Sequence, residues 1–339
     1  MRIVLSGFGV VAQAFTRLLE ERGAELYEAH GVTPRIVAAI DRGGAAVSDR
    51  GLSGEALLGA KESDGSVAGV PDHGARGIDA ISVIRDIDAD LLIEATPSVM
   101  RDPGPAMERI KSAFAHGMHV VSVNKAPLAV ATPALLELAR YNRVEFRFSG
   151  TVGAGTPMLA TLRQISRGDR IERVRAILNG TTNYILSRMH DEGADFDIVL
   201  QDAIRLGYAE TDPSADIDGI DAATKVVILA NVALGRPLTI DQLRIEGIRD
   251  MSRERVESAH SRGMRLKLIG EIGADVGVSV QEVPADSPLN VGGSLNALSL
   301  SLRYNGEVTL IGRGAGGVET ATAVLRDTLD IWDSVGERA

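Results

Sequence analysis

The chain opens with the stretch Arg2-Ile3-Val4-Leu5-Ser6-Gly7-Phe8-Gly9-Val10-Val11-Ala12, and this stretch decides how its first half folds. The first five residues form an apolar run typical of a buried β-strand, and residues 11–19 follow with helical periodicity. Between the two lies G-x-G-x-x-A, in the strand–turn–helix context of a dinucleotide-binding turn. Gly7 permits the tight turn, Gly9 lets a pyrophosphate approach the backbone, and Ala12 allows close helix packing. We therefore predict a dinucleotide site here, in preference to a turn that is merely rich in glycine.

Strand and helix patterns alternate from this turn to about residue 150. Apolar runs predict strands at residues 2–6, 35–40, 91–96, 119–123 and 145–149. Between later strands, helices are predicted at 105–116 and 132–141. This alternation is typical of an α/β domain with a doubly wound, mostly parallel, Rossmann-type sheet, which we place at residues 1–150. The segment 43–77 is rich in Gly, Ala and Ser, and we expect it to be irregular apart from one short helix at 55–60.

Polar residues follow several of these strands, at the sheet edge where such folds bind their ligands. Asp41 is positioned to bind the adenosine ribose of NAD, whereas Arg42 beside it could hold the 2′-phosphate of NADP, so the preference stays open. Thr96 and Ser98 should face the cofactor, although helix capping is an alternative role. Lys125 also ends a strand, and we expect it to face an anionic ligand or substrate.

The second half of the chain has a different pattern. A glycine cluster at 150–157 predicts a hinge whose exposed carbonyls could ligate a hard cation. Beyond it, helices are predicted first, up to the one that starts at Ile220, and strands are predicted at 171–178 and then after residue 265, which is typical of an α+β domain at residues 151–313. An amphipathic helix within about 314–339 is expected to pack back on the first domain.

The stretch from Gly207 to Lys225 carries the densest charge in the chain. Its acids are Glu210, Asp212, Asp216, Asp218 and Asp221. Asp221 and Lys225 are spaced i,i+4, so they share one face of the helix predicted from Ile220. A solvated acidic loop with a surface ion pair is one interpretation. The other is a lysine held by carboxylates at the mouth of a pocket and poised to act as an acid, which the small residues around Asp221 favour.

Composition excludes several classes of function. The 339 residues suffice for two domains, and 45% hydrophobic with 24% charged residues is ordinary for a soluble protein. A formal net charge of −10 without a basic cluster argues against nucleic-acid or anionic-membrane partners. The chain has no Cys, which excludes thiolate catalysis and disulfides, and no apolar run of membrane-spanning length. We expect a cytoplasmic enzyme that acts on a small molecule.

Taken together, these motifs resemble homoserine dehydrogenase over nearly the whole chain. The segments that carry the resemblance are 7–11, 95–98, 124–128, 151–157, 178–184 and, most specifically, 207–225. The resemblance implies interconversion of L-aspartate 4-semialdehyde and L-homoserine with NAD or NADP, in threonine, methionine and isoleucine biosynthesis. It also implies a homodimer formed through the second-domain sheet, which would make that domain both catalytic and dimerising.

The resemblance also assigns roles to individual residues. The catalytic residues would be Lys225 as the acid–base group, Asp221 as its partner, and Lys125 between nicotinamide and substrate. Glu210 would hold the substrate amino group, and the substrate site would also include Asp216, Thr181 and Gly180. The cofactor-binding set would comprise Gly7, Phe8, Gly9, Val10, Val11, Asp41, Arg42, Thr96, Ser98, Lys125 and Gly316. A sodium ion could bind the carbonyls of Val152, Ala154 and Thr156, although Ser149 stands where the family often has a glutamate.

Two alternatives remain beside this interpretation. One is another two-domain NAD(P)-dependent amino-acid or aldehyde reductase. The other is a catalytically dead NAD(P)-binding regulatory protein, in which the set formed by Glu210, Asp221 and Lys225 should be broken; here it is intact.

Overall fold

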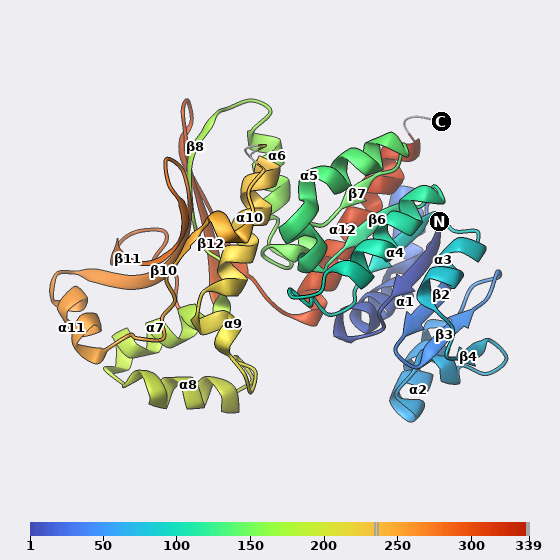
Figure 1. The fold of residues 1–339 in the computed structure, drawn as a ribbon, viewed down its shortest axis with the longest axis horizontal. Helices are drawn as coiled ribbons and strands as arrows, with labels where there is room; N and C mark the ends of the chain where they lie inside the picture. Colours follow the sequence, from blue (N-terminus) through green and yellow to red (C-terminus); the bar gives the residue numbers. More distant parts are fainter. Residues whose placement is uncertain (234, 236, 337–339) are drawn as a thin grey trace. The chain divides into compact units, whose positions relative to one another are not determined.

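The computed structural model describes residues 1–233, 235 and 237–336 (Figure 1). The chain divides into two compact units: Met1–Thr151 together with the segment from Gly316 onward, and Val152–Ala315. Of the helix predicted within 314–339, residues 337–339 lie outside the described residues. Among the described helices, none combines the length and apolar character needed to cross a membrane.

The first unit is built on a seven-stranded sheet with the order β4-β3-β2-β1-β5-β6-β7. Its strands are β1 (Arg2–Ser6), β2 (Arg35–Asp41), β3 (Gly44–Val47), β4 (Gly74–Arg76), β5 (Leu91–Glu94), β6 (His119–Ser122) and β7 (Phe146–Arg147). Strands β1, β2, β5, β6 and β7 are parallel, whereas β3 and β4 join antiparallel at one edge. The predicted α/β class with a mostly parallel sheet is confirmed.

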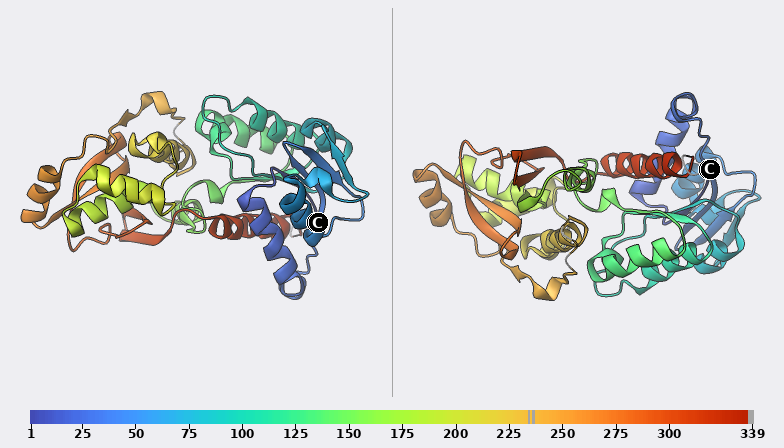
Figure 2. Two further views of the ribbon diagram at one scale, coloured as in Figure 1. Left: turned by 90° about the horizontal axis from the view of Figure 1, so that it is seen from below. Right: turned by 90° about the horizontal axis from the view of Figure 1, so that it is seen from above.

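Helices cover this sheet and complete its core. They are α1 (Val10–His30), α2 (Gly54–Asp64), α3 (Ala80–Asp86), α4 (Gly104–Ala115), α5 (Lys125–Tyr141) and α12 (Gly317–Gly336), with short 3-10 turns η1 (Val67–Gly69) and η2 (Ser149–Thr151). The last helix, α12, runs beside α1 (Figure 2). Its Val324, Leu325 and Ile331 are buried in one cluster with Phe15 and Leu5, so α12 belongs to the core of the first unit.

Helix α5 begins earlier than the sequence predicted. The sequence predicted a helix at 132–141, but the helix already starts at Lys125. The side chain of Asn124 caps it by accepting a hydrogen bond from the backbone N–H of Ala126 (3.1 Å). Ala131, two residues before Pro133, departs from helical geometry, which explains why the pattern indicated a helix only from residue 132.

The segment 43–77 also differs from the prediction of an irregular stretch. It contains β3, β4 and an eleven-residue helix, α2, in place of a single short helix. Ala45 and Ala46 are fully buried in β3, where alanine offers little β-propensity for a pattern to detect.

Asp41, at the end of β2, organises this segment. Its carboxylate accepts hydrogen bonds from the backbone N–H groups of Gly43 (2.9 Å) and Val67 (3.2 Å) and from the Ser66 hydroxyl (2.6 Å). The Lys61 ammonium, on α2, pairs with it at 2.7 Å. Burial raises the pKa of Asp41, but these hydrogen bonds outweigh burial and leave the pKa below its ordinary value.

The second unit combines a six-stranded sheet, in the order β13-β12-β8-β10-β11-β9, with helices. The strands are β8 (Ile171–Ile177), β9 (Arg244–Ile245), β10 (Met264–Ile272), β11 (Val276–Pro284), β12 (Leu295–Leu302) and β13 (Gly306–Arg313). The helices are α6 (Met158–Ile165), α7 (Gly180–Glu192), α8 (Phe196–Arg205), α9 (Ser214–Ile217), α10 (Ile220–Ala233) and α11 (Arg253–Ser261), with the turn η3 (Ile240–Gln242). Gly270 on β10 lets Val226 of α10 pack closely on the sheet. The expected α+β class of this half is confirmed.

Replacing Gly7 with alanine should destabilise the first unit. Gly7 has φ +92°, and an added Cβ would lie 2.7 Å from the backbone of Ala95. We expect Gly7→Ala to cost roughly 1–3 kcal/mol of unfolding free energy and to lower the thermal midpoint. Gly9→Ala is the matched control, because Gly9 has φ −87° and open space around its Cβ position. Equal thermal midpoints for the two variants would contradict this account.

Asp41→Asn should destabilise the fold in a pH-dependent way. Because the folded-state pKa is depressed, the carboxylate contributes stability above the unfolded-state pKa of about 4 and loses it as pH falls through the folded-state value. We expect a deficit of about 1–3 kcal/mol near pH 7 that shrinks in acid. Urea unfolding across pH 3–7 measures it, with Glu62→Gln, an exposed position on α2, as control. A deficit of constant size across that range would refute the role.

Candidate active site

The i,i+4 pair of the acidic stretch is partly buried and tied to the sheet. Lys225 is 8% exposed, and its ammonium lies 2.7 Å from the Asp221 carboxylate on the same helix, α10. The ammonium also donates to the backbone carbonyl of Leu178, 2.6 Å away, directly after β8. A buried cation is costly unless its donors are satisfied, and these two acceptors hold it in one place. The interpretation as a solvated surface pair is therefore wrong.

Asn179 links this pair to a second acid. Its side-chain amide donates to Asp216 (2.6 Å) and to Asp221 (3.0 Å), while its side-chain oxygen accepts from the backbone N–H of Thr182 (2.9 Å). The last contact makes Asn179 the N-cap of α7. Because the oxygen must face that N–H, the amide hydrogens necessarily point to the carboxylates. One side chain thus starts a helix and holds two acids beside Lys225.

The environment of Asp216 makes it a weaker acid than usual. Burial raises its pKa, and the negative charge of Asp221 raises it further, against the hydrogen bond from Asn179. Two neighbouring carboxylates with one cation, Lys225, near them form a site that attracts positive charge. Such a cluster can receive an ammonium-bearing ligand and move a proton.

The other predicted substrate residues lie around the start of α7. The Thr181 hydroxyl donates to the carbonyl of Tyr208 (2.7 Å), and the Tyr208 ring stacks on Tyr184 with ring centroids 4.4 Å apart. These contacts anchor the loop that carries Glu210, whose side chain is exposed. Packing requires a glycine at position 180, because a Cβ there would lie 2.8 Å from the carbonyl oxygen of Ser294.

In the first unit, the fingerprint turn fits a dinucleotide phosphate. Gly9 precedes α1 as its N-cap residue, with no side-chain cap, no acid in the first turn and nothing within 4 Å of its Cβ position. Anions bind well at such a helix start. Val10 is 72% exposed beside it, whereas the Phe8 side chain is 1% exposed and belongs to the core, so Phe8 can offer a ligand only its backbone.

Two further predicted cofactor residues flank the same turn. Val11 is half-buried against the core of the first unit. Gly316 has φ +130° and precedes Gly317, whose α-carbon lies so close to Val10 that a Cβ there would clash. The structure therefore brings the start of α12 next to the fingerprint turn.

Asp41 is the last residue of β2, and Arg42 follows it. Both carboxylate oxygens of Asp41 already accept two hydrogen bonds each within the protein, which fills the acceptor capacity of a carboxylate. A ribose hydroxyl would have to displace one of them. Arg42 next to it is exposed. These contacts limit the ribose role that the sequence suggested for Asp41.

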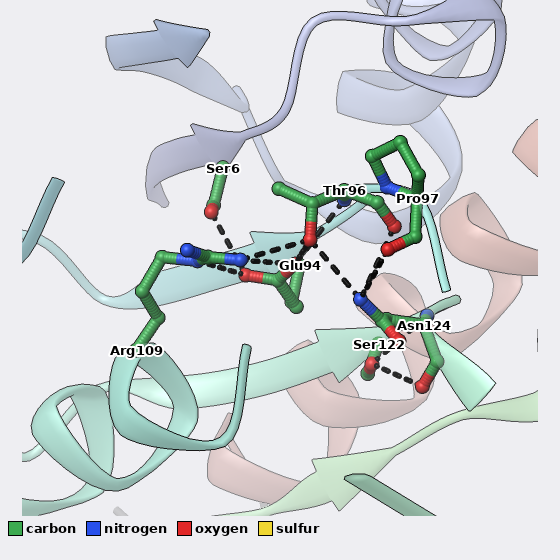
Figure 3. A network of polar contacts seen from close by, with 7 residues as sticks. All are labelled: Ser6, Glu94, Thr96, Pro97, Arg109, Ser122 and Asn124. Carbon is green, nitrogen blue, oxygen red and sulfur yellow. Dashed lines mark hydrogen bonds and ion pairs between the residues drawn. The ribbon is translucent and has the colours of Figure 1, made fainter. Parts of the chain in front are cut away.

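Thr96, Ser98 and Lys125 gather at the carboxyl ends of β5 and β6 (Figure 3 shows the Thr96 side of this edge). The Ser98 hydroxyl accepts from the backbone N–H of Lys125 (2.8 Å), which is the first residue of α5. The Thr96 hydroxyl contacts the buried carboxylate of Glu94 and the guanidinium of Arg109 (2.9 Å). Three predicted residues thus share one edge, together with an ion pair that the sequence did not suggest.

The glycine-rich segment before α6 offers carbonyls but no acidic ligand. Val152 and Ala154 are buried, and the Thr156 carbonyl accepts from the backbone N–H of Met158 (2.7 Å). Among the described residues, no group of three or more His, Asp or Glu side chains is arranged to hold a metal ion. At Ser149 the backbone N–H donates to Asp327 of α12 (2.7 Å). The sodium site stays a prediction.

The sequence analysis assigned no role to several residues of these clusters. In the second unit, the Leu178 carbonyl accepts from Lys225, the Asn179 amide binds two acids, and the Tyr208 ring stacks on Tyr184. In the first unit, Glu94 and Arg109 form the buried ion pair. A usable signal existed for Asn179, because an Asn between a strand and a helix is a common N-cap. No comparable local signal existed for the carbonyl of Leu178.

Comparisons with known proteins place the chain among related sequences and structures. The family model for homoserine dehydrogenase matches residues 157–329. A homoserine dehydrogenase of Methanocaldococcus jannaschii is 39% identical over 98% of this chain and 99% of its own length, and an NAD(+)-dependent homoserine dehydrogenase of Pseudomonas canavaninivorans is 37% identical over 98% and 96%. A hyperthermophilic archaeal homoserine dehydrogenase, solved in complex with NADPH, superimposes with a TM-score of 0.85 at 30% identity, covering 98% of each chain. The resemblance predicted from the motifs is thereby confirmed: the chain belongs to the homoserine dehydrogenase family.

Proposed function

We propose that the protein interconverts L-aspartate 4-semialdehyde and L-homoserine, with Lys225 as the general acid–base residue. As a member of this family it is an oxidoreductase that uses NAD or NADP. The observation that carries the residue assignment is the position of the Lys225 ammonium, between the Leu178 carbonyl and the Asp221 carboxylate.

The cofactor would be held by the first unit. Gly9 leaves room for the pyrophosphate at the start of α1, and Val10 is exposed beside it. Ser98 and Lys125, at the edge formed by β5 and β6, would bind the nicotinamide half. When bound, the nicotinamide supplies a hydride to the aldehyde or accepts one from the alcohol.

The role of Lys225 follows from charge. Reduction of an aldehyde carbon leaves negative charge on its oxygen, and an ammonium within hydrogen-bonding reach stabilises that charge and gives up its proton. The Asp221 carboxylate orients the ammonium and favours its cationic form. In the reverse direction, the neutral amine accepts the proton of the homoserine hydroxyl.

The substrate amino group would be bound by acids around α7. Glu210 is exposed on a loop that Thr181 and the stacked tyrosines anchor, so its carboxylate is available to an ammonium group. Asp216, held by Asn179 at the start of α7, would add negative charge to the substrate site. Gly180 keeps the start of α7 free of a side chain.

Lys225→Ala should remove turnover without weakening cofactor binding. Loss of general acid catalysis predicts a kcat lower by about 10²–10⁴-fold. Steady-state assays with aspartate semialdehyde measure kcat, and fluorescence titration measures the Kd for NADPH. Lys111→Ala, on the exposed face of α4, is the control. Wild-type turnover by Lys225→Ala would end the assignment.

Glu210→Gln should act mainly on substrate affinity. Losing one charged hydrogen bond to an ammonium costs about 1.5–3 kcal/mol, so we expect KM for the semialdehyde to rise roughly 10–100-fold. The KM for the nicotinamide cofactor should not change. Asp250→Asn, an exposed acid elsewhere in the second unit, serves as the control. An unaltered semialdehyde KM would refute the amino-group role.

One assay separates the proposal from its alternatives. Protein, aspartate semialdehyde and NADPH or NADH are mixed, and the fall in nicotinamide absorbance is followed. A different two-domain reductase would favour another aldehyde, and a dead regulatory protein would bind the cofactor without turnover. The biosynthetic pathway, the cytoplasmic location, the homodimer and the sodium ion stay predictions.

A further inference from the structure

Glu94 and Arg109 form a buried ion pair beside Thr96 in the first unit, and neither residue is among those assigned above (Figure 3). Glu94, the last residue of β5, has a side chain that is fully buried. Its carboxylate accepts from the Ser6 hydroxyl of β1 (2.8 Å) and from two nitrogens of Arg109 on α4 (2.8 and 3.3 Å). It also accepts from the backbone N–H of Thr96 (3.2 Å) and from the Thr96 hydroxyl.

The Thr96 hydroxyl is the centre of this network. It donates to Glu94 and accepts from Arg109 (2.9 Å) and from the Asn124 side-chain amide (3.1 Å). A hydroxyl has one hydrogen to donate and two lone pairs to accept with, so its capacity is filled inside the protein. Thr96 can therefore offer a cofactor its backbone carbonyl and its methyl group, but neither its hydroxyl nor its backbone N–H.

Asn124 extends the network to α5. Its amide also reaches the carbonyls of Thr96 and Pro97 (both 3.2 Å), and its side-chain oxygen caps α5 at Ala126. The neighbouring Ser98 hydroxyl accepts from the Lys125 backbone N–H (2.8 Å). The pair is thus connected, through one hydroxyl and one amide, to the loop and helix start that carry Ser98 and Lys125.

Stability alone does not explain why a protein keeps a buried ion pair. Replacing such a pair with apolar residues is often neutral or stabilising, whereas leaving one charge alone is costly. Here the pair has a geometric consequence, because the fork of Arg109 holds Glu94 and Thr96 at once. A planar guanidinium presents its donors in a fixed fork, whereas an ammonium is a compact charge whose donors rotate freely.

We propose that Glu94 and Arg109 are positioning residues for the nicotinamide half of the cofactor. They act through Thr96 and Asn124, which set the positions of Ser98 and Lys125. The proposal rests on the assignment of this edge to the nicotinamide in the proposed function. It does not depend on Lys225 or on the identity of the carbonyl substrate.

The test compares whole-cofactor binding with binding of the adenosine half alone. NADPH and NADH are titrated by fluorescence, and 2′,5′-ADP and ADP by calorimetry, against the wild type, Glu94→Gln and Arg109→Lys. If these substitutions move Ser98 and Lys125 away from the nicotinamide, the Kd for NADPH and NADH should rise about 10–100-fold. The Kd for 2′,5′-ADP and ADP should not change. Lys111→Met, on the same helix, α4, should change neither value.

Steady-state kinetics give a second readout. The KM for the reduced cofactor should rise in both variants while the KM for the semialdehyde stays constant. Equal loss of cofactor and fragment binding, or no loss of either, would overturn the proposal. Wild-type protein that binds NADPH but turns over no semialdehyde would instead count against the proposed function alone.

Thr96→Val keeps the test decisive if either charge variant fails to fold. It leaves the Glu94–Arg109 contact through Nε in place and removes only the hydroxyl that joins the pair to Asn124. The proposal predicts the same selective loss of reduced-cofactor affinity in Thr96→Val. Binding equal to the wild type in this folded variant would overturn it.

Discussion

The contact on which the second unit depends is the one between the Lys225 ammonium and the carbonyl of Leu178. It joins the middle of α10 to the end of β8, and Asp221 completes the neutralisation from one helical turn earlier. A lysine this buried is costly without acceptors, so this contact fixes the position of α10 relative to the end of β8. Asn179 follows Leu178 directly, and this is why the α7 cap and both acids converge on the same point.

The first unit uses a related arrangement. There too an asparagine two residues after the end of a strand caps the next helix, and its amide reaches side chains beyond the helix it starts. Asn124 leads to Thr96 and the Glu94–Arg109 pair, as Asn179 leads to Asp216 and Asp221. In both cases charged groups are satisfied within the protein before any ligand arrives. Such preorganisation reduces the rearrangement that binding or reaction would require.

The sequence was sufficient wherever local chemistry determined the structure. The fingerprint turn, the alternation of strands and helices, and the i,i+4 pair of Asp221 and Lys225 all have short-range signatures. Strands β3 and β4 were missed because their small residues, such as Ala45 and Ala46, carry little strand propensity. The start of α5 was missed because Asn124 is followed by a proline-containing turn, a pattern that is equally typical of a loop.

Within the sites, partners that are distant along the chain could not be predicted. Glu94 bonds Ser6 from 88 residues away, and Asn179 bonds Asp216 across 37 residues. No periodicity reports such a pairing, since it depends on strand order and on which helix end meets which loop. Asp41 is a further example: its position at the end of β2 suggested a ligand role, but its contacts with Gly43, Lys61, Ser66 and Val67 had no signal in the sequence.

Chemical rescue tests the central claim most directly. Lys225→Ala removes the ammonium and leaves its acceptors, the Leu178 carbonyl and the Asp221 carboxylate, in place. Small primary amines added to this variant should restore reduction of the semialdehyde in a saturable manner, while Lys225→Met, whose side chain fills the space, should not respond. Turnover that no amine changes, in a Lys225→Ala enzyme that still binds cofactor and homoserine, would contradict the account.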